Sequence, residues 1–423
     1  MRAFRADLTA FAVAVGIIVS AAGAGYFLNQ AGVPLFADAA PLFGYWLAHA
    51  GPGTPLALMT ALAVVIWGPP LADRLPWRGL LAAGYLGSLL WTFSLAMVEG
   101  WQEGIAGRLT HEPEYLHDVP RVTGIPAMLS GFTDHILLQP GSWTVHVSGH
   151  PPGALLLYVW LDRLGLGGGA AAGVLSLLVG ATVAISVPIA VRALNGVDAA
   201  RASVPFLVLF PGAVWVGVSA DGVFMGVVAA AVALFAIGSV WSAAIAGLLF
   251  GWAIFLNYGL VLAGTFVLAI VLRTRRIMPL LVAAATGLAV VGAFAAAGFW
   301  WFDGYHLVVQ RYYQGEFALR PYSYWVWGNL GALLLSAGPV AAVVVRRSVG
   351  GWRSAAFVAA ALLAVLAADL SGLSKAEVER IWLPFAVWFA AGAGLLPAAH
   401  RRGWLAVQAL TALAVNHLVV TNW

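Results

Sequence analysis

Residues 8–28 read LTAFAVAVGIIVSAAGAGYFL, a run without a charged side chain. Its length matches that of an α-helix crossing the hydrocarbon core of a bilayer, which takes about 20 apolar residues. The short segment before it carries Arg2 and Arg5, and no small-residue cleavage site followed by a soluble domain comes after it. The run is therefore interpreted as an uncleaved first membrane span.

Apolar runs of the same kind recur along the chain. Taking spans of about 17 to 25 residues, we predict about thirteen transmembrane helices, near residues 8–28, 55–72, 79–99, 168–191, 202–218, 222–240, 242–257, 259–272, 278–299, 325–345, 354–370, 381–397 and 404–421. The composition agrees, because 62% of the residues are hydrophobic and only 9% are charged, against about 25% charged in a soluble domain. The sequence thus predicts an all-α polytopic membrane protein that forms a single transmembrane domain over residues 1–423.

Lys and Arg side chains are distributed unevenly between the two sides of these spans. With the N-terminus in the cytoplasm, few of the 21 Lys and Arg residues fall outside, namely Arg108, Arg121, Arg163, Arg311, Arg320, Lys375 and Arg380. Positive charge concentrates in the cytoplasmic loops of membrane proteins, so the sequence predicts a multi-pass cell-membrane protein with a cytoplasmic N-terminus. Most acidic residues fall outside instead, a skew that favours proton abstraction or divalent-cation binding at the outer face.

One polar segment interrupts the apolar pattern and gathers carboxylates and imidazoles, namely Glu99, Glu103, Glu112, Glu114, Asp118, Asp134, His111, His117, His135, His146 and His150. We predict that residues 99–165 form an extracytoplasmic loop. Within it, a helix from about Pro152 to Leu164 is too short to cross the bilayer and is expected to lie at the interface. A membrane protein that concentrates ionisable groups in one non-spanning segment is expected to carry chemistry there, although a merely solvated loop is the plain alternative.

Three carboxylates are the candidate catalytic residues. Glu99 and Glu103 stand at the outer end of the third span with the i, i+4 spacing that places two side chains on one helix face. In a partly dehydrated site, such a pair can divide the work of a base; alternatively, both mark the boundary between lipid and water. Asp221 lies in a tight outer turn, where a carboxylate is costly unless it caps a helix or faces a polar cavity.

Candidate binding residues follow in the outer loops. His150-Pro151-Pro152 forms a rigid extended entry to a helix and aims the imidazole at the interface. Later outer loops are basic and aromatic, and they contain Arg311, Tyr313, Arg320, Lys375, Glu379 and Arg380. Arginine and lysine can hold a phosphate, whereas an aromatic belt with snorkelling cations is the alternative. Cysteine is absent, which excludes a thiolate metal site and a cysteine nucleophile.

The order of these motifs along the chain resembles that in the C superfamily of membrane glycosyltransferases (GT-C). This superfamily includes the protein O-mannosyltransferases and the lipid A aminoarabinose transferase. Its members carry an acidic residue after an early span, then interfacial helices with Lys or His before Pro-Pro, then a second acidic residue in the next outer turn. The matching positions here are Glu99 or Glu103, His150-Pro151-Pro152, and Asp221. The resemblance covers roughly Leu80 to Pro384, and its short motifs gain specificity from their order and sidedness.

The chain also departs from that superfamily. The glycine-spaced run from Gly247 to Asn257 looks like one of its helices, but asparagine stands where lysine is often found. Two extra spans precede the acidic one, so Asp38 in the first outer loop competes with Glu99 and Glu103 for the position of the base.

The resemblance implies an enzyme that moves a sugar from a polyprenyl-phosphate donor to a hydroxyl of a cell-envelope glycan or glycolipid at the extracytoplasmic face. It implies Glu103 or Glu99 as the base for the acceptor hydroxyl, and Asp221 as support for the acceptor or a metal. Substrate binding is implied for His150, Arg311, Tyr313, Arg320, Lys375, Glu379 and Arg380. The implied partners are the donor, the acceptor and membrane lipid, without nucleic acid.

The stretch Glu377-Val-Glu-Arg-Ile-Trp382 further looks like actinobacterial membrane proteins that include a methylthioxylose transferase acting on lipoarabinomannan. The donor sugar, the acceptor, inverting or retaining stereochemistry and the need for a divalent cation stay open. Two other functions also stay open. A transporter or flippase of a lipid-linked sugar should place ionisable residues near mid-membrane on broken helices, and a non-catalytic scaffold should show an outer surface without a pocket.

Overall fold

The computed structural model describes residues 2–217, 219–351 and 355–422. The expected spans 202–218 and 354–370 each include one residue outside this part, Val218 and Ser354. Within the described residues the chain is mainly helical, and strands β1 (Gly44–Trp46) and β2 (Val419–Thr421) form a two-stranded antiparallel sheet. The predicted all-α polytopic membrane fold is confirmed.

Long apolar helices carry the fold. In the described part, five helical segments are long and apolar enough to cross a membrane, formed by α1 (Arg2–Gln30), α2 (Thr54–Arg74), α3 (Trp77–Ala96), α7 (Gly169–Ala181) with α8 (Val183–Asn195), and α14 (Ile277–Ala296). A sixth is the pair α16 (Tyr322–Ser336) and α17 (Val340–Ser348), which is bent by 101°. Gly338 lies at this bend with a φ of 83°, a backbone conformation that glycine adopts without steric cost.

Shorter helices occupy the other predicted ranges. The apolar ones are α11 (Asp221–Ile237), α12 (Val240–Leu256), η7 (Tyr258–Ala263) with α13 (Gly264–Thr274), α18 (Ala356–Leu370), and α20 (Leu383–Ala386) with η9 (Val387–Leu395). The remaining ones are α9 (Val197–Val208), α10 (Ala213–Val216), α19 (Val378–Ile381), η10 (Ala398–His400) and α21 (Arg401–Leu418). Each range predicted as a span therefore contains helix.

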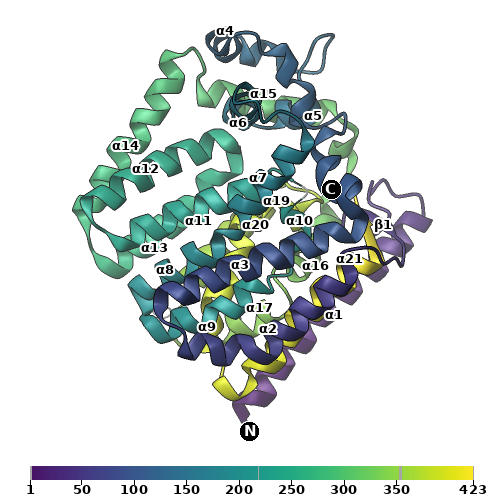
Figure 1. Cartoon of the computed structure of the whole chain (residues 1–423). Coiled ribbons are helices and arrows are strands. Elements are labelled where there is room, and N and C mark those ends of the chain that lie inside the picture. The colour runs from purple at the N-terminus through teal and green to yellow at the C-terminus, as the bar shows by residue number, and fades with distance from the viewer. Residues whose placement is uncertain (1, 218, 352–354, 423) are drawn as a thin grey trace.

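The polar loop is a chain of short helical turns. These are η1 (Met97–Glu99), η2 (Gln102–Ala106), η3 (Arg108–Thr110), η4 (Tyr115–His117), η5 (Val119–Arg121), α4 (Ile125–Ser130), η6 (Phe132–His135), α5 (Val145–Gly149) and α6 (Pro152–Arg163). Helix α6 matches the predicted short helix, with a proline in its first turn. Figure 1 shows α4, α5, α6 and α15 (Trp301–Gln314) gathered at the end of the molecule away from the N-terminus, and η8 (Glu316–Leu319) follows α15.

The predicted helix face shared by Glu99 and Glu103 is wrong. Gly100 between them has a φ of 80° and ends the turn η1, and a π-helical turn begins at Gln102. The i, i+4 relation holds only along a continuous α-helix. The two carboxylates consequently have different surroundings, since Glu99 is half-buried and Glu103 is exposed.

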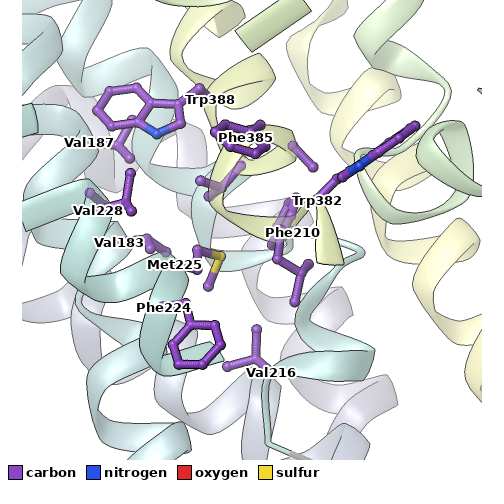
Figure 2. Close-up of a cluster of buried hydrophobic side chains, with 14 of the residues drawn as sticks. Val183, Val187, Phe210, Val216, Phe224, Met225, Val228, Trp382, Phe385 and Trp388 are labelled. Atoms are coloured by element: carbon purple, nitrogen blue, oxygen red, sulfur yellow. The ribbon is translucent and has the colours of Figure 1, made fainter. Parts of the chain in front are cut away.

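Close helix packing depends on small residues at one interface. A Cβ atom added to Gly247 of α12 would lie only 2.2 Å from the carbonyl oxygen of Ala283 on α14. Glycine therefore lets the two backbones approach, as small residues do in membrane helix pairs. Figure 2 shows a nearby cluster of buried hydrophobic side chains, which includes Phe224 and Met225 of α11 together with Trp382 and Phe385. This apolar core lies next to the helix ends that carry the candidate site.

At the N-terminal end of the molecule, arginines bind the ends of helices. Arg201 donates to the carbonyl oxygens of Ala72 and Leu75 at the end of α2, at 2.5 and 2.9 Å. The buried carboxylate of Asp7 accepts hydrogen bonds from both Arg346 and Arg347. Cations near helix C-termini satisfy unpaired carbonyls and the helix dipole. Arg201, Arg346 and Arg347 therefore stabilise the fold at this end of the molecule.

Candidate functional site

The carboxylate of Asp221 stands at the start of α11. It does not cap the helix, whose N-cap residue Ala220 has no side-chain hydrogen bond, and instead its Oδ2 accepts a hydrogen bond of 2.7 Å from Nη1 of Arg380. Asp221 is 2% exposed. Its Oδ1 atom has no hydrogen-bond partner among the residues that the structure describes, and the positive end of the α11 dipole favours a carboxylate at this position.

Charges of alternating sign continue from this pair. Nη2 of Arg380 donates to Oε2 of Glu377 at 2.8 Å, and Oε1 of Glu377 accepts from Nη1 of Arg320 at 3.1 Å. We call Asp221, Arg380, Glu377 and Arg320 the Asp221 network. Burial lowers the pKa of Arg380, but Asp221 and Glu377 outweigh burial and leave this pKa raised. Burial likewise opposes ionisation of Glu377, yet the two arginines hold its pKa below the usual range.

A strained turn places Glu377 in this network. Both Ala376 and Glu377 have positive φ angles, 68° and 62°, a region that residues other than glycine occupy at a cost and that is enriched at functional sites. The turn directs the Glu377 carboxylate back toward Arg380 on α19. Positive φ angles at residues other than glycine cannot be predicted from this short stretch of sequence.

Arg320 and Lys375 join the loops around the network. Besides Glu377, Arg320 donates to the carbonyl oxygens of Leu35, Phe36 and Lys375. Nζ of Lys375 donates to the carbonyl oxygens of Ala318 and Arg320, at 2.8 and 2.9 Å. Burial, followed by the charge of Arg320, lowers the pKa of Lys375.

The polar loop contributes a second acidic group to the same region. Oε2 of Glu114 lies 3.0 Å from Nδ1 of His146, and both side chains are buried. Burial opposes ionisation of Glu114, but the charges of His146 and Arg380 outweigh it and lower the pKa of Glu114. The ring of Tyr115 lies 5.9 Å from that of His146 and stacks on Tyr158 at 5.3 Å. The hydroxyl of Tyr158 has no hydrogen-bond partner among the described residues.

His150 is held on both ring nitrogens. Nδ1 lies 2.7 Å from the carbonyl oxygen of His146, so it donates, and Nε2 lies 3.2 Å from the amide nitrogen of Asn257 and accepts. Burial lowers the pKa of His150 to about 4, although Asp221 acts in the opposite direction. His150 is thus neutral near pH 7 and links the start of α6 to the end of α12.

Glu379 adjoins the network on the side of the sheet. Its Oε1 accepts a hydrogen bond of 2.8 Å from the backbone nitrogen of Phe43, and the residue is fully buried. Burial raises the pKa of Glu379 to about 7. This carboxyl group can therefore change its protonation near neutral pH.

The other predicted acids lie in different surroundings. Oε1 of Glu99 lies 2.7 Å from Nε2 of His49, whose ring stacks at 6.3 Å on that of His417. Arg108 interacts electrostatically with both Glu99 and Glu103, and burial lowers the pKa of Arg108. We call Glu99, His49, His417 and Arg108 the Glu99 cluster. A cavity of about 20 Å³ borders Glu99 and Arg108, which is room for one water molecule.

Three predicted residues lie at the margins. Arg311 and Tyr313 belong to α15, where Arg311 is half-buried and Tyr313 is 66% exposed. Burial lowers the pKa of Arg311. Asp38, the rival for the base, is exposed in the loop that follows α1.

The structure thus brings together residues from four separate segments of the sequence, namely Asp221, Arg380, Arg320, Lys375, Glu379 and His150. In the part of the chain that it describes, Glu99 pairs with His49 rather than with this group. Sequence reasoning missed Glu114, His146 and Glu377 as individual site residues. The density of acids and histidines in the polar loop was the available signal, but it could not tell a buried member from a solvated one.

A metal site has no preformed ligand set in the described residues, because no group of three or more His, Asp or Glu side chains is arranged to hold an ion there. The carboxylates of the network are instead matched by arginines. The chemistry that this arrangement supports directly is hydrogen bonding and proton transfer.

No family model and no curated protein matches the chain. A solved structure that is similar to it is that of ArnT from Cupriavidus metallidurans in the apo state, with 17% sequence identity and a TM-score of 0.43. The similar region covers 67% of this chain and 54% of that chain, so this chain spans about half the length of ArnT. ArnT is an aminoarabinose transferase of the C superfamily that the sequence motifs resemble, but a likeness of this size does not place the chain in that superfamily.

Proposed function

We propose that this protein is a glycosyltransferase that moves a sugar from a polyprenyl-phosphate donor to a hydroxyl of a cell-envelope glycan or glycolipid. The observation that supports it most is the Asp221 network, with Oδ1 of Asp221 and the hydroxyl of Tyr158 lacking partners among the described residues. Buried polar atoms without partners cost free energy, so they are typical of a site that a polar ligand or water completes. The hydroxyl groups of a sugar can serve both atoms.

Lys375 and Arg311 are the proposed cations for the donor phosphate. Arg320 and Arg380 are each neutralised by a carboxylate within 4 Å, whereas no carboxylate of a described residue lies that close to Lys375 or Arg311. Cations that the fold leaves uncompensated can neutralise a phosphate and stabilise the charge of the leaving group. Arg320 then acts by holding the loops that position Lys375, and Tyr313 offers an exposed ring face on α15.

The proposed site lies at the extracytoplasmic face of a multi-pass membrane protein whose N-terminus is cytoplasmic. The excess of Lys and Arg on the N-terminal side supports this orientation. The gathering of α4, α5, α6 and α15 at the opposite end agrees with residues 99–165 being an outer loop (Figure 1). The single domain over residues 1–423 belongs to the same proposal.

The base that deprotonates the acceptor hydroxyl stays a prediction for Glu99 or Glu103, and Asp221 is proposed to orient the acceptor. The Glu99 cluster places one of these acids next to His49 and Arg108. A divalent cation would have to be brought in with the phosphate of the donor, since hard cations take carboxylate and phosphate oxygens as ligands.

Glycan and lipid profiling of a deletion strain tests the proposal. We expect one sugar decoration of the envelope to disappear, and lipoarabinomannan is the first glycan to examine in an actinobacterial host. The wild-type gene should restore it, and genes carrying Asp221→Ala or Lys375→Ala should not, at equal protein levels in the membrane. An unchanged envelope in the deletion strain would overturn the proposal.

A transporter or flippase of a lipid-linked sugar is the alternative. Its strongest candidate residue is Asp369, whose Oδ1 accepts a hydrogen bond of 2.9 Å from the amide nitrogen of Asn329. Asp369 lies in the last turn of α18, however, and not in the middle of the helix. Reconstituted vesicles containing a fluorescent lipid-linked sugar separate the two functions. Movement of this lipid between leaflets without sugar transfer would favour the transporter.

A further inference from the structure

An apolar groove lies between α3 and α7, two helices that belong to candidate membrane spans. Its volume of about 370 Å³ is within the range of small-molecule sites. The side chains that line it are apolar or aromatic, and some are strongly exposed, such as Leu86 at 61%. Inside a bilayer, hydrocarbon rather than water fills such a surface. The lining of this α3–α7 groove includes Leu86, Leu90 and Phe93 of α3, Val174 and Leu178 of α7, and Trp101.

Contacts at both ends give the groove a fixed shape. At the end away from the polar loop, the hydroxyl of Tyr85 on α3 donates to the carbonyl oxygen of Leu178 on α7 at 3.3 Å. At the other end, Gly100 with its φ of 80° ends η1, and the π-helical turn η2 follows. This break places Trp101 at the end of the groove, and tryptophan favours the level of the lipid head groups. The groove therefore runs along the span and ends at the polar loop.

The α3–α7 groove adjoins the Glu99 cluster. Leu177, which lines the groove, packs in one hydrophobic cluster with Ala96 and Ile105. Ala96 also lines the small cavity that borders Glu99 and Arg108. One layer of side chains thus separates the groove from this cavity. A lipid whose chain lies in the groove would hold its head group near the acids predicted to serve as the base.

The charge at the polar end of the groove selects the kind of head group. Glu99 and Glu103 stand two residues before and two residues after Trp101, and Glu103 is exposed. Arg108 interacts electrostatically with both acids, but no cation of a described residue lies within 4 Å of the Glu103 carboxylate. Carboxylates accept hydrogen bonds from hydroxyl groups and repel a phosphate. The groove end therefore suits a neutral sugar better than the phosphate of the donor.

We propose that the α3–α7 groove binds the hydrocarbon chain of a neutral glycolipid, and that this glycolipid is the acceptor. The inference rests on the proposed function and selects a lipid-anchored acceptor over a free glycan, which has no use for the groove. A hydroxyl oxygen of the glycolipid bonds to the anomeric carbon of the donor sugar, and its proton passes to the Glu99 or Glu103 carboxylate. The bond from that carbon to the phosphate oxygen breaks, and the polyprenyl phosphate leaves with the electron pair.

Photolabelling tests the groove directly. The full chain in phosphatidylcholine nanodiscs receives a trace of monoglucosyl dioleoylglycerol that carries a diazirine in one acyl chain, and phosphatidylglycerol with the same chains is the anionic comparison. Peptide mass spectrometry maps the labelled residues. We expect the glucosyl lipid to label residues 86–101 and 174–178 about five times as strongly as phosphatidylglycerol, a ratio typical of one exposed charge.

Two variants with matched controls separate the chain from the head group. Leu90→Trp fills the groove and should lower labelling by the glucosyl lipid about 10-fold, because the chain loses apolar contacts. Leu288→Trp, at an exposed leucine of α14, should leave it unchanged. Glu103→Gln should raise labelling by phosphatidylglycerol about three-fold, because a repelling charge is removed. Glu112→Gln, at an exposed acid of the same loop, should match the wild type.

Three results would overturn the inference. Equal labelling of the wild-type groove by the two lipids would show ordinary membrane lipid there, and stronger labelling by photoreactive farnesyl phosphate would assign the groove to the donor. Leu90→Trp should also lower the restored glycan of the deletion strain about 10-fold, and a wild-type level would remove the acceptor role. An unchanged envelope in the deletion strain overturns the proposed function instead, whatever the labelling.

Discussion

The Asp221 network and the Glu99 cluster are both built from carboxylates and cations at helix ends, but water reaches them differently. In the network, the side chains of Arg380 and Asp221 are 6% and 3% exposed, whereas Glu99 in the cluster is 30% exposed. Charges removed from water interact strongly and depend on each other, while exposed pairs contribute little. The reactivity of an acid at the end of a membrane span therefore depends on its neighbours rather than on its position in the sequence.

The largest effect is expected from Arg380→Ala. This substitution leaves Asp221 and Glu377 as buried carboxylates without their shared cation, which should destabilise the protein by about 3–5 kcal/mol. Denaturant unfolding in detergent measures the loss. Arg78→Ala, which removes an exposed arginine at the start of α3, is the matched control and should stay within about 0.5 kcal/mol of the wild type. Equal effects of the two would contradict the contrast between buried and exposed charge.

Glu379 should make stability depend on pH. Its pKa rises from 4.5 in the unfolded chain to about 7 in the folded protein because it is buried. Between these values the unfolded state releases the proton first, so stability should fall as pH rises through this range, by about 3 kcal/mol in total. Glu379→Gln should remove this slope. A slope that persists in the variant would assign it to another group.

Glu114 and Glu377 affect the pH dependence of stability in the opposite direction to Glu379. The pKa values of Glu114 and Glu377 are lowered by their cationic neighbours, after burial has acted against them. Their contribution to stability is present above the unfolded value of 4.5 and is lost as pH falls below it. Comparing wild type and Glu379→Gln over pH 4 to 8 therefore isolates the contribution of Glu379 to the pH dependence of stability.

A smaller effect is expected from Asn257→Ala. The amide nitrogen of Asn257 donates to Nε2 of His150 at 3.2 Å, and losing this bond between α6 and α12 should cost about 1 kcal/mol. Thermal unfolding measures it. Asn257→Asp is a useful companion, because a carboxylate beside Nε2 should favour the protonated ring of His150 and raise its pKa from about 4. A titration of His150 unchanged in Asn257→Asp would argue against the assigned hydrogen bond.

The sequence predicted the helices because a bilayer demands long apolar runs, and each predicted range contains helix. It also predicted the helix that begins at Pro152, since proline favours a first turn. It failed at Gly100, where a single positive φ separates Glu99 from Glu103. Local conformation of this kind depends on tertiary contacts that an apolar pattern does not contain.

Some residues of the candidate site could be predicted from the sequence and others could not. Asp221, Lys375 and Arg380 could be selected from the sequence, because a charged side chain between apolar spans costs free energy and is typical of a functional site. Glu114 and His146 do not stand out, because their loop holds many acids and histidines. Burial of both side chains, with the ring of His146 against that of Tyr115, distinguishes these two residues from their solvated neighbours.

The smallest effects are expected in the Glu99 cluster. Glu99→Gln keeps the shape of the side chain and removes one partner of a half-exposed pair with His49, so stability should fall by about 1 kcal/mol or less. Glu103→Gln replaces an exposed carboxylate and should change stability by about 0.5 kcal/mol or less. Unfolding in detergent at pH 7 compares both with the wild type. A loss of several kcal/mol for Glu99→Gln would show that this cluster is as tightly coupled as the Asp221 network, and the contrast between them would fail. The glycan level of the same strains tests Glu99 as the base, because a base at Glu99 predicts loss of the glycan in a protein that stays folded.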